Sequence, residues 1–240
     1  MELLTSNLRD LVKLNLLFCL CVLPSAIAFL LGLFGFFSSV MYTLSLLAAF
    51  PVGGAVVACF FCITKMFRDQ PSYIWYDFKR KFLENMKQAA APGMLCVAFI
   101  YTQILMWGTI FFSGVSIDAV WIAIGVIVLL IFDMVVPYMF LQIAYIKLRT
   151  RQVMKNSVLI AFINTPRSFL GAITGGVIWI AYALLLPTSL YATPLILIIG
   201  FTFSWWLCLF WIWPPVNKLF KIEEVLKERQ NCENVTDDRQ

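Results

Sequence analysis

One stretch without charge decides the fold. Residues 14–64 read LNLLFCLCVLPSAIAFLLGLFGFFSSVMYTLSLLAAFPVGGAVVACFFCIT, and none of these 51 side chains is charged. At about 1.5 Å of rise per residue, a helix of that length reaches roughly 75 Å, more than two crossings of a hydrocarbon core about 30 Å thick. Residues 168–217 form a second such stretch. The sequence therefore predicts an all-α integral membrane protein with several spans.

The composition of the chain agrees with this prediction. Of the 240 residues, 62% are hydrophobic and 13% are charged, whereas a typical soluble domain is about 25% charged. The chain contains no histidine, which excludes His-based zinc sites and Ser-His-Asp triads. The net charge of +5 comes from basic residues beside apolar runs, as at the inner face of a membrane. We expect no nucleic acid partner, no metal or cofactor, and no enzymatic activity.

Turn residues divide the apolar stretches into a bundle of six predicted membrane helices. Pro51-Val52-Gly53-Gly54 interrupts the second helix, Thr165-Pro166 supplies an N-cap and first helical residue for the fifth, and Pro214-Pro215 ends the sixth. A cytoplasmic segment at 1–13 and a C-terminal helix and tail at 217–240 flank a transmembrane domain at 14–216. The six spans are expected at about 14–37, 42–64, 88–112, 119–146, 166–187 and 194–213.

The distribution of basic residues predicts the orientation of the chain. Residues 1–13 contain two Lys or Arg, residues 65–87 six, residues 147–167 five and residues 214–240 five, which accounts for all 18. Cytoplasmic loops are enriched in Lys and Arg, and six spans place all four segments on one side. We therefore expect a multi-pass protein of the cell membrane with both termini in the cytoplasm.

Residues 73–87 have the pattern of a short basic amphipathic helix. Apolar side chains recur at helical spacing from Trp75 to Met86, and most basic side chains lie opposite them. This pattern fits a helix that lies on anionic lipid headgroups, or a docking surface for a partner protein. The candidate lipid or partner surface consists of Trp75, Phe78, Lys79, Arg80, Lys81, Phe82 and Lys87.

Asp133 is the one ionisable residue predicted near the middle of a span. A charged Asp there costs roughly 2.5–3.5 kcal/mol on insertion scales, and no Lys or Arg lies at a comparable depth. Pro137 has no N–H, which frees the Asp133 carbonyl. The carboxyl is expected to be protonated, hydrogen-bonded to a group such as Gln103 or Tyr101, in contact with water, or paired with a cation or another subunit. With the freed carbonyl it forms the candidate lining of a polar pocket. The candidate intramembrane site consists of Asp133, Pro137 and Gln103.

Two groups of small residues leave further alternatives open. Gly171 and Gly175 form a small-xxx-small pair, which serves close helix packing inside the bundle or the face of a homodimer. The Pro51–Gly54 segment is either a tolerated kink or a broken helix of the kind that builds transporter sites.

Short motifs follow one another along the chain in a fixed order. They are Phe50-Pro51-Val52-Gly53-Gly54-Ala55, Thr64-Lys65-Met66-Phe67-Arg68, Asp77-Phe78, Glu84-Asn85-Met86-Lys87-Gln88, Pro137-Tyr138, Lys155-Asn156 and Asn164-Thr165-Pro166-Arg167. In order and spacing, over roughly residues 10–220, they resemble the bacterial YesL family of small polytopic membrane proteins. Its members are often encoded beside carbohydrate ABC importers. The resemblance implies an accessory role in sugar uptake, with permease or ATPase subunits of the importer as partners.

The chain itself lacks the sequence marks of an importer subunit. It contains no Walker A sequence, G-x-x-x-x-G-K-[ST], and neither basic loop contains the EAA-x3-G sequence that is usual in importer permeases. We therefore expect a non-catalytic accessory or partner subunit of a carbohydrate ABC import system. The alternative is an independent small-solute transporter or channel that uses Asp133 in its pathway.

Cysteine labelling tests the predicted orientation, in a variant whose native cysteines have been replaced. A cysteine at Ser116 or Thr188 is expected to react with a membrane-impermeant reagent on intact cells, because both positions fall in predicted external loops. A cysteine at Ser72 or Thr150 should react only after the cells are opened. Labelling of position 150 in intact cells would contradict the six-span assignment.

Overall fold

The computed structural model describes residues 2–35, 37–70, 73–112, 118–146, 148–185, 196–222 and 224, and this part of the chain is almost entirely helical. The predicted external loops near 113–118 and 187–193 lie largely outside these residues. The helices are α1 (Glu2–Leu33), α2 (Ser38–Ala48), α3 (Val52–Met66), α4 (Ile74–Phe112), α5 (Ala119–Tyr145), α6 (Thr150–Ile163), α7 (Thr165–Leu185), the π-helix η2 (Ile196–Gly200) and α9 (Phe201–Phe220).

Four of these helical segments are long and apolar enough to cross a membrane, namely Leu8–Leu33, Ile74–Ile110, Ala119–Tyr145 and Ile198–Phe220. Two further candidates are bent pairs, in which α2 meets α3 at 41° and α6 meets α7 at 99°. The protein is thus an all-helical, multi-pass membrane protein with four to six candidate spans in the part of the chain described.

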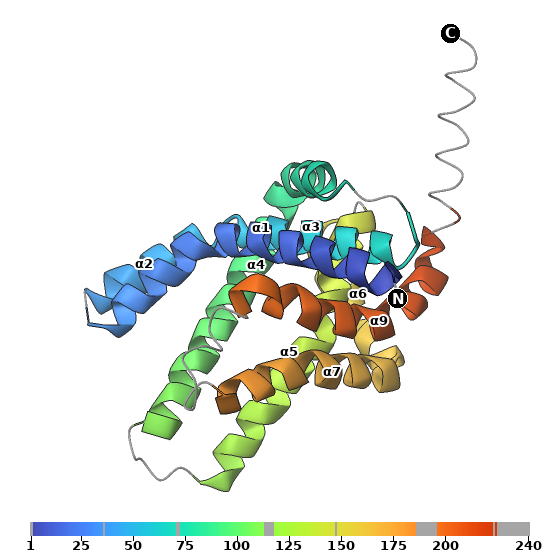
Figure 1. The fold of residues 1–240 in the computed structure, drawn as a ribbon. Helices are drawn as coiled ribbons and strands as arrows, with labels where there is room; N and C mark the ends of the chain where they lie inside the picture. The colour runs from blue at the N-terminus through green and yellow to red at the C-terminus, as the bar shows by residue number, and fades with distance from the viewer. Residues whose placement is uncertain are drawn as a thin grey trace.

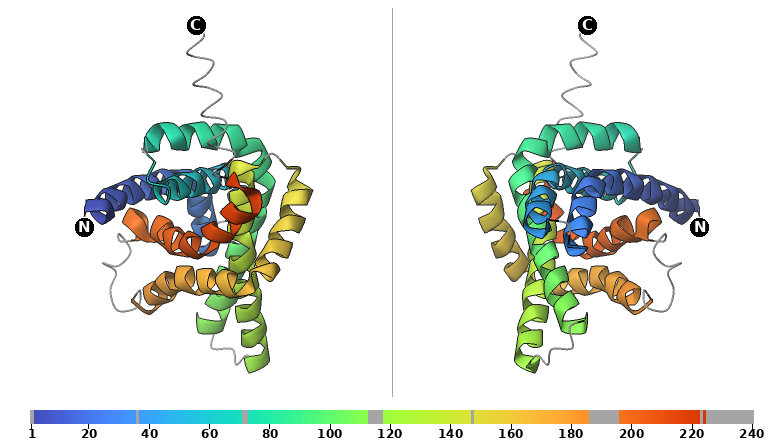
Figure 2. Two further views of the ribbon diagram at one scale, coloured as in Figure 1. Left: turned by 90° about the vertical axis from the view of Figure 1, so that its right-hand side faces the viewer. Right: turned by 90° about the vertical axis from the view of Figure 1, so that its left-hand side faces the viewer.

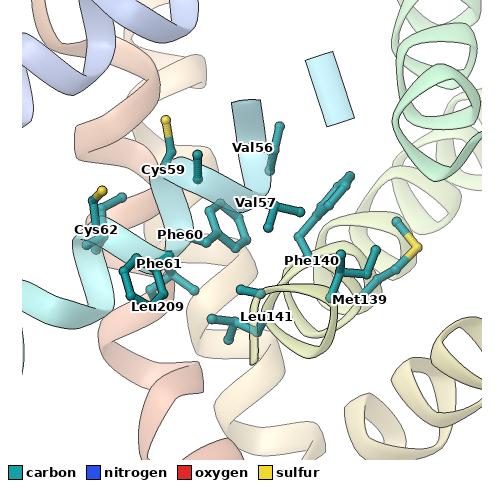
Figure 3. Packing of buried hydrophobic residues seen from close by; sticks show 14 of the residues in the cluster. Val56, Val57, Cys59, Phe60, Phe61, Cys62, Met139, Phe140, Leu141 and Leu209 are labelled. Carbon is teal, nitrogen blue, oxygen red and sulfur yellow. The ribbon is translucent and has the colours of Figure 1, made fainter. Parts of the chain in front are cut away.

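Helix α3 occupies the centre of the bundle. Every residue from Val52 to Met66 except Lys65 is buried. Figure 1 shows α1, α3 and α9 side by side, while α4 and α5 run next to each other toward the lower part of the molecule. In Figure 3, Val57 and Phe60 of α3 face Phe140 and Leu141 of α5, with Leu209 of α9 nearby. A helix surrounded in this way contacts protein rather than lipid, so its side chains form the core.

Two glycines bring the backbones of α3 and α4 into direct contact. A Cβ atom on Gly53 would overlap the carbonyl oxygen of Ala89, and a Cβ atom on Gly93 would overlap the backbone of Gly53. A Cβ on Gly54 would lie 3.2 Å from the Cα atom of Met86. The Pro51–Gly54 segment therefore serves close packing between helices, because α4 fills the space beside its glycines.

A buried polar contact joins the first and last spans. The Asn15 side chain is fully buried, and its oxygen accepts a hydrogen bond from the backbone N–H of Thr202 at an N···O distance of 3.0 Å. The Thr202 hydroxyl donates to the Leu11 carbonyl at 3.0 Å. These bonds tie α1 to the start of α9, across 187 residues of sequence.

The structure corrects several boundaries in the segments that the sequence predicts to be cytoplasmic. The amphipathic segment 73–87 and the third span form one continuous helix, α4, whose first turns lie across the top of the molecule before the chain turns downward (Figure 2). Residues 150–163 form α6 rather than a loop. Residues 2–13 are the first turns of α1 rather than a separate segment.

Other boundaries move by a few residues. Helix α1 ends at Leu33, and the predicted second span is two helices that meet at residues 49–51. Thr165 is the first residue of α7 and not its cap, because its hydroxyl donates backward to the Phe162 carbonyl at 2.5 Å.

The Pro214-Pro215 pair does not end the last span, since α9 continues to Phe220. A proline inside a helix costs about 3 kcal/mol, but Trp213, Pro215 and Val216 are all buried here. Their burial offsets the lost backbone hydrogen bonds. The remainder of the predicted C-terminal helix lies almost entirely outside the described residues.

Gly53→Ala tests the backbone contact between α3 and α4. The added methyl group must push α4 away at Ala89, so we expect a loss of about 1–3 kcal/mol or more of stability and a lower Tm in detergent. Gly108→Ala is the control, because Gly108 is also a helical glycine, in α4, and a Cβ there meets nothing within 4 Å. Equal Tm values for the two variants would contradict the contact.

Candidate functional site

Asp133 lies half-buried in α5 and makes no hydrogen bond or ion pair with the residues that the structure describes. Pro137, one turn further along α5, is buried in the core. No described polar group therefore holds the Asp133 carboxyl in place.

The predicted partners of Asp133 are engaged elsewhere or lie apart from it. The Tyr101 hydroxyl is 2.7 Å from the Ser25 hydroxyl, and its ring stacks on Phe29 with 3.9 Å between centroids. The Gln103 carbonyl oxygen is buried and has no hydrogen-bond partner among the described residues. The structure thus does not join Asp133, Pro137 and Gln103 into a hydrogen-bonded site, which corrects the predicted bond to Gln103 or Tyr101.

The first turns of α4 divide the predicted lipid or partner surface into an inner and an outer part. Phe78 is 6% exposed, and the Phe82 ring lies against the Gly54 position of α3. Trp75 is 66% exposed, so it does not belong to the apolar face that the sequence assigned to it. Ile74, 5% exposed, takes that place. The apolar side of this helix is therefore covered by α3 and not by headgroups.

The basic residues of this surface also differ from one another. Lys79 and Lys87 are exposed and form no ion pair in the described part of the chain. Arg80 reaches the Asp77 carboxylate at 3.5 Å. Lys81 pairs with Glu84 at 2.8 Å, and its ammonium group lies 4.9 Å from the centroid of the Phe61 ring. The free outer surface consists of Trp75, Tyr76, Lys79, Leu83 and Lys87.

A polar cluster that sequence reasoning missed joins the ends of α3, α5 and α9. We call it the Arg68 cluster, and it consists of Thr64, Arg68, Tyr145 and Trp213. The Tyr145 hydroxyl is 2.6 Å from the Thr64 hydroxyl, and it accepts a hydrogen bond of 3.1 Å from the Arg68 guanidinium. The guanidinium carbon lies 5.7 Å from the centroids of both the Tyr145 and the Trp213 rings. Arg68 thus holds three helix ends together through cation–π contacts and a hydrogen bond.

An ion pair and an amide contact extend this network to α4 and the start of α6. The Lys65 ammonium lies 2.6 Å from the Asp77 carboxylate, and these side chains are only 16% and 4% exposed. The Gln88 amide donates to the Leu148 carbonyl at 2.6 Å. Two of the four basic segments of the sequence, 65–87 and 147–167, therefore meet at one end of the bundle.

The sequence carried one signal for this network. Residues 65–87 contain six basic residues and three acids, Asp69, Asp77 and Glu84. An acid among so many basic side chains often pairs with one of those side chains. The pairing of Lys65 with Asp77 depends on how α3 and α4 cross, which sequence periodicity does not give.

The Gly171–Gly175 pair packs inside the chain. A Cβ on Gly171 would lie 3.2 Å from the Cys208 carbonyl oxygen, and a Cβ on Gly175 would lie 3.3 Å from the Cys208 Cβ. The Ser204 hydroxyl donates to the Gly175 carbonyl at 2.7 Å. This pair is the α7–α9 contact, which confirms the interpretation as close packing and removes these glycines as a homodimer face.

Within the described residues, no group of three or more Cys, Asp or Glu side chains could hold a metal ion. Comparisons of the chain with protein-family models, with curated proteins and with solved structures found no match.

Removing Asp77 tests the buried ion pair. Asp77→Ala leaves the Lys65 ammonium without its partner, and loss of one member of a buried pair costs about 3–5 kcal/mol, so we expect a large fall in Tm. Glu84→Gln breaks the exposed pair with Lys81 and should cost less than about 1 kcal/mol.

The double variant Lys65→Met/Asp77→Leu distinguishes charge from packing. It leaves no buried charge, so it should recover most of the stability lost in Asp77→Ala. A double variant as unstable as Asp77→Ala would assign the loss to packing instead of charge.

Proposed function

We propose that the protein is a non-catalytic accessory or partner subunit of a bacterial carbohydrate ABC import system. In this proposal it has six spans, resides in the cell membrane and has both termini in the cytoplasm. It contacts membrane lipids along its sides and binds the permease or ATPase subunits of the importer at its cytoplasmic end.

The six-span arrangement is supported by the connections between helix ends. The Arg68 cluster requires the ends of α3, α5 and α9 to lie at one end of the bundle. With six spans, these ends are the cytoplasmic ends of the second, fourth and sixth spans. The basic segments 65–87, 147–167 and 214–240 follow directly after them, as the positive-inside rule requires.

One observation carries the partner assignment. The start of α4 presents Trp75, Tyr76, Lys79 and Lys87 outward while its inner side is fixed to α3. Ile74, Phe78 and the Lys65–Asp77 pair hold it there. Aromatic and basic side chains on a rigid support lose little conformational entropy on binding. This surface is therefore suited to docking at the cytoplasmic end.

Residues of the motifs that carry the resemblance to the YesL family take part in contacts between helices. Gly53 and Gly54 touch α4, Lys65 pairs with Asp77, and the Tyr138 hydroxyl lies 2.9 Å from the Ser168 hydroxyl. These contacts hold the helices together, and the proposed accessory role requires no chemistry from them.

Charge reversal on α4 tests the partner assignment. Lys79→Glu/Lys87→Glu changes the two exposed basic residues that make no ion pair in the described structure, so the fold should be retained. We expect co-purification of importer subunits to fall at least tenfold, because like charges then face the partner. The measurement is a quantitative pull-down from membranes.

Lys218→Glu is the control for that pull-down. Lys218 is exposed near the end of α9 and lies outside the proposed surface, so this variant should bring down the importer subunits as the wild type does. A complex that survives reversal of Lys79 and Lys87 would remove α4 from the interface.

A second candidate function is transport of a small solute or cation through a pathway that contains Asp133. The observation that favours it is that two polar groups within the spans have no hydrogen-bond partner among the described residues. The Asp133 carboxyl makes no hydrogen bond in the described structure, and the Gln103 oxygen is buried and unpaired there. Polar groups inside a membrane are costly unless they bind one another, water or a substrate.

Asp133→Asn and Asp133→Leu test this candidate in liposomes. Since no described group depends on the carboxyl, both variants should retain the wild-type Tm, and Leu should not leave a buried partner unsatisfied. If Asp133 lies in a pathway, Asn abolishes solute uptake by removing the ionisable group. Equal uptake by wild type and Asn would exclude an ionisable pathway, and no uptake by wild type favours the accessory function.

A further inference from the structure

Helix α6 has an outward side whose polarity changes along its length. The exposed residues Arg151, Lys155, Val158 and Phe162 follow one another at intervals of four, three and four, so they form one stripe on the helix. Val158 is 43% exposed and Phe162 is 55% exposed. The stripe is thus basic in the first half of α6 and apolar in the second.

The rotation of α6 about its axis is fixed by its inward side. Val153, Ser157 and Ile160 are at most 4% exposed and lie on the opposite side of the helix. The Gln142 amide of α5 donates to the Ser157 hydroxyl at 2.8 Å, and that hydroxyl donates to the Val153 carbonyl at 2.7 Å. The stripe therefore cannot turn inward without breaking a buried hydrogen bond.

The basic half of the stripe has no counter-ion among the residues that the structure describes. Residues 134–222 contain no Asp or Glu. Arg149 stands just before α6 and is also exposed, and Arg149, Arg151 and Lys155 form none of the ion pairs found among the described residues. Three adjacent positive charges with no acid in the neighbouring sequence attract an anion.

The apolar half of the stripe continues an exposed apolar surface. Leu159 and Ile163 flank it and are 59% and 70% exposed, and the exposed apolar side chains continue into α7 at Phe169 and Leu170. Arg167 is exposed just after the 99° bend between the two helices. Exposed apolar side chains therefore run without interruption from the second half of α6 into the start of α7.

We propose that the outward side of α6 binds an anionic phospholipid of the cytoplasmic leaflet. The lipid phosphate lies between Arg151 and Lys155, and an acyl chain lies along Val158 and Phe162. Lys155 and Phe162 are separated by seven residues, or roughly 10 Å along the helix axis, so headgroup and chain contacts fit on one lipid molecule. The proposal rests on the membrane position proposed above and does not depend on an importer partner.

A lipid fits this stripe better than an acidic protein does. A protein partner would need to cover apolar side chains that are continuous with those of a membrane span, and it would have to enter the bilayer to do so. The lipid already provides both the negative headgroup and the apolar chain at the required depth.

Lipid titration of the purified, delipidated full-length protein in a neutral detergent tests the proposal. Native mass spectrometry measures binding of phosphatidylglycerol, phosphatidylcholine and inorganic phosphate. We expect phosphatidylglycerol to bind at least tenfold more tightly than phosphatidylcholine. Inorganic phosphate alone should neither compete nor raise the Tm, because it lacks the chain. Equal binding of the two lipids, or full competition by free phosphate, would overturn the proposal.

Matched variants locate the binding on α6. Arg151→Gln/Lys155→Gln should weaken phosphatidylglycerol binding about 30-fold, at roughly 1 kcal/mol per basic residue. Lys79→Gln/Lys87→Gln removes the same charge from α4 and should change binding less than threefold. Equal losses in the two variants would show a general charge effect and overturn the site.

Two further variants separate binding from folding. Arg151→Lys/Lys155→Arg keeps both charges and should bind as the wild type does, even if the glutamine variant is poorly folded. Phe162→Ser removes a chain contact and should weaken binding of phosphatidylglycerol while leaving the Tm without lipid unchanged, because the side chain is exposed. Unchanged binding in Phe162→Ser, or loss of binding in the charge-conserving variant, would contradict the proposed pose.

Discussion

The backbone contact between Gly53 and Gly93 is the constraint on which the other helix positions depend. Side chains at either position would separate α3 from α4, and α3 is the helix that the rest of the bundle surrounds. With the two backbones in contact, Phe82 and Met86 reach the Gly54 position, and Lys65 comes within 2.6 Å of Asp77. The crossing of two helices thus determines which charges meet at the end of the bundle.

The polar contacts of the bundle are of two kinds. Arg68, Tyr145 and Trp213 combine charge, hydrogen bonding and aromatic contact. Tyr138 and Ser168, and Asn15 and Thr202, pair as neutral groups. Neutral pairs avoid the desolvation penalty that charges incur in a medium of low polarity. Asp133 departs from this pattern, which is why it remains the main candidate for a pathway.

The sequence predicted the features that depend on local composition. Absence of charge over residues 14–64 and 168–217 identified the membrane helices, and the small residues at 171 and 175 identified a packing contact that the structure confirms. Features that depend on which helices meet could not be predicted. Tyr101 fits Asp133 by depth, yet it lies against Ser25 and Phe29. Trp75 and Ile74 both fit the helical spacing that leads to Phe78, and only the crossing with α3 shows that Ile74 is the buried one. Helix α6 went unrecognised because a polar residue, Ser157, stands in its buried stripe and obscures the amphipathic pattern.

The bond between Asn15 and Thr202 has a consequence for how the protein is made. Its acceptor emerges from the ribosome with the first span and its donor with the last, 187 residues later. Throughout that interval the growing chain contains a helix whose polar side chain has not yet reached its final neighbour. The contact forms only after Thr202 has been synthesised, so a chain that stalls before α9 lacks the bond that ties α1 to it. The position of the earliest helix is therefore completed late, by a residue that is made long after that helix.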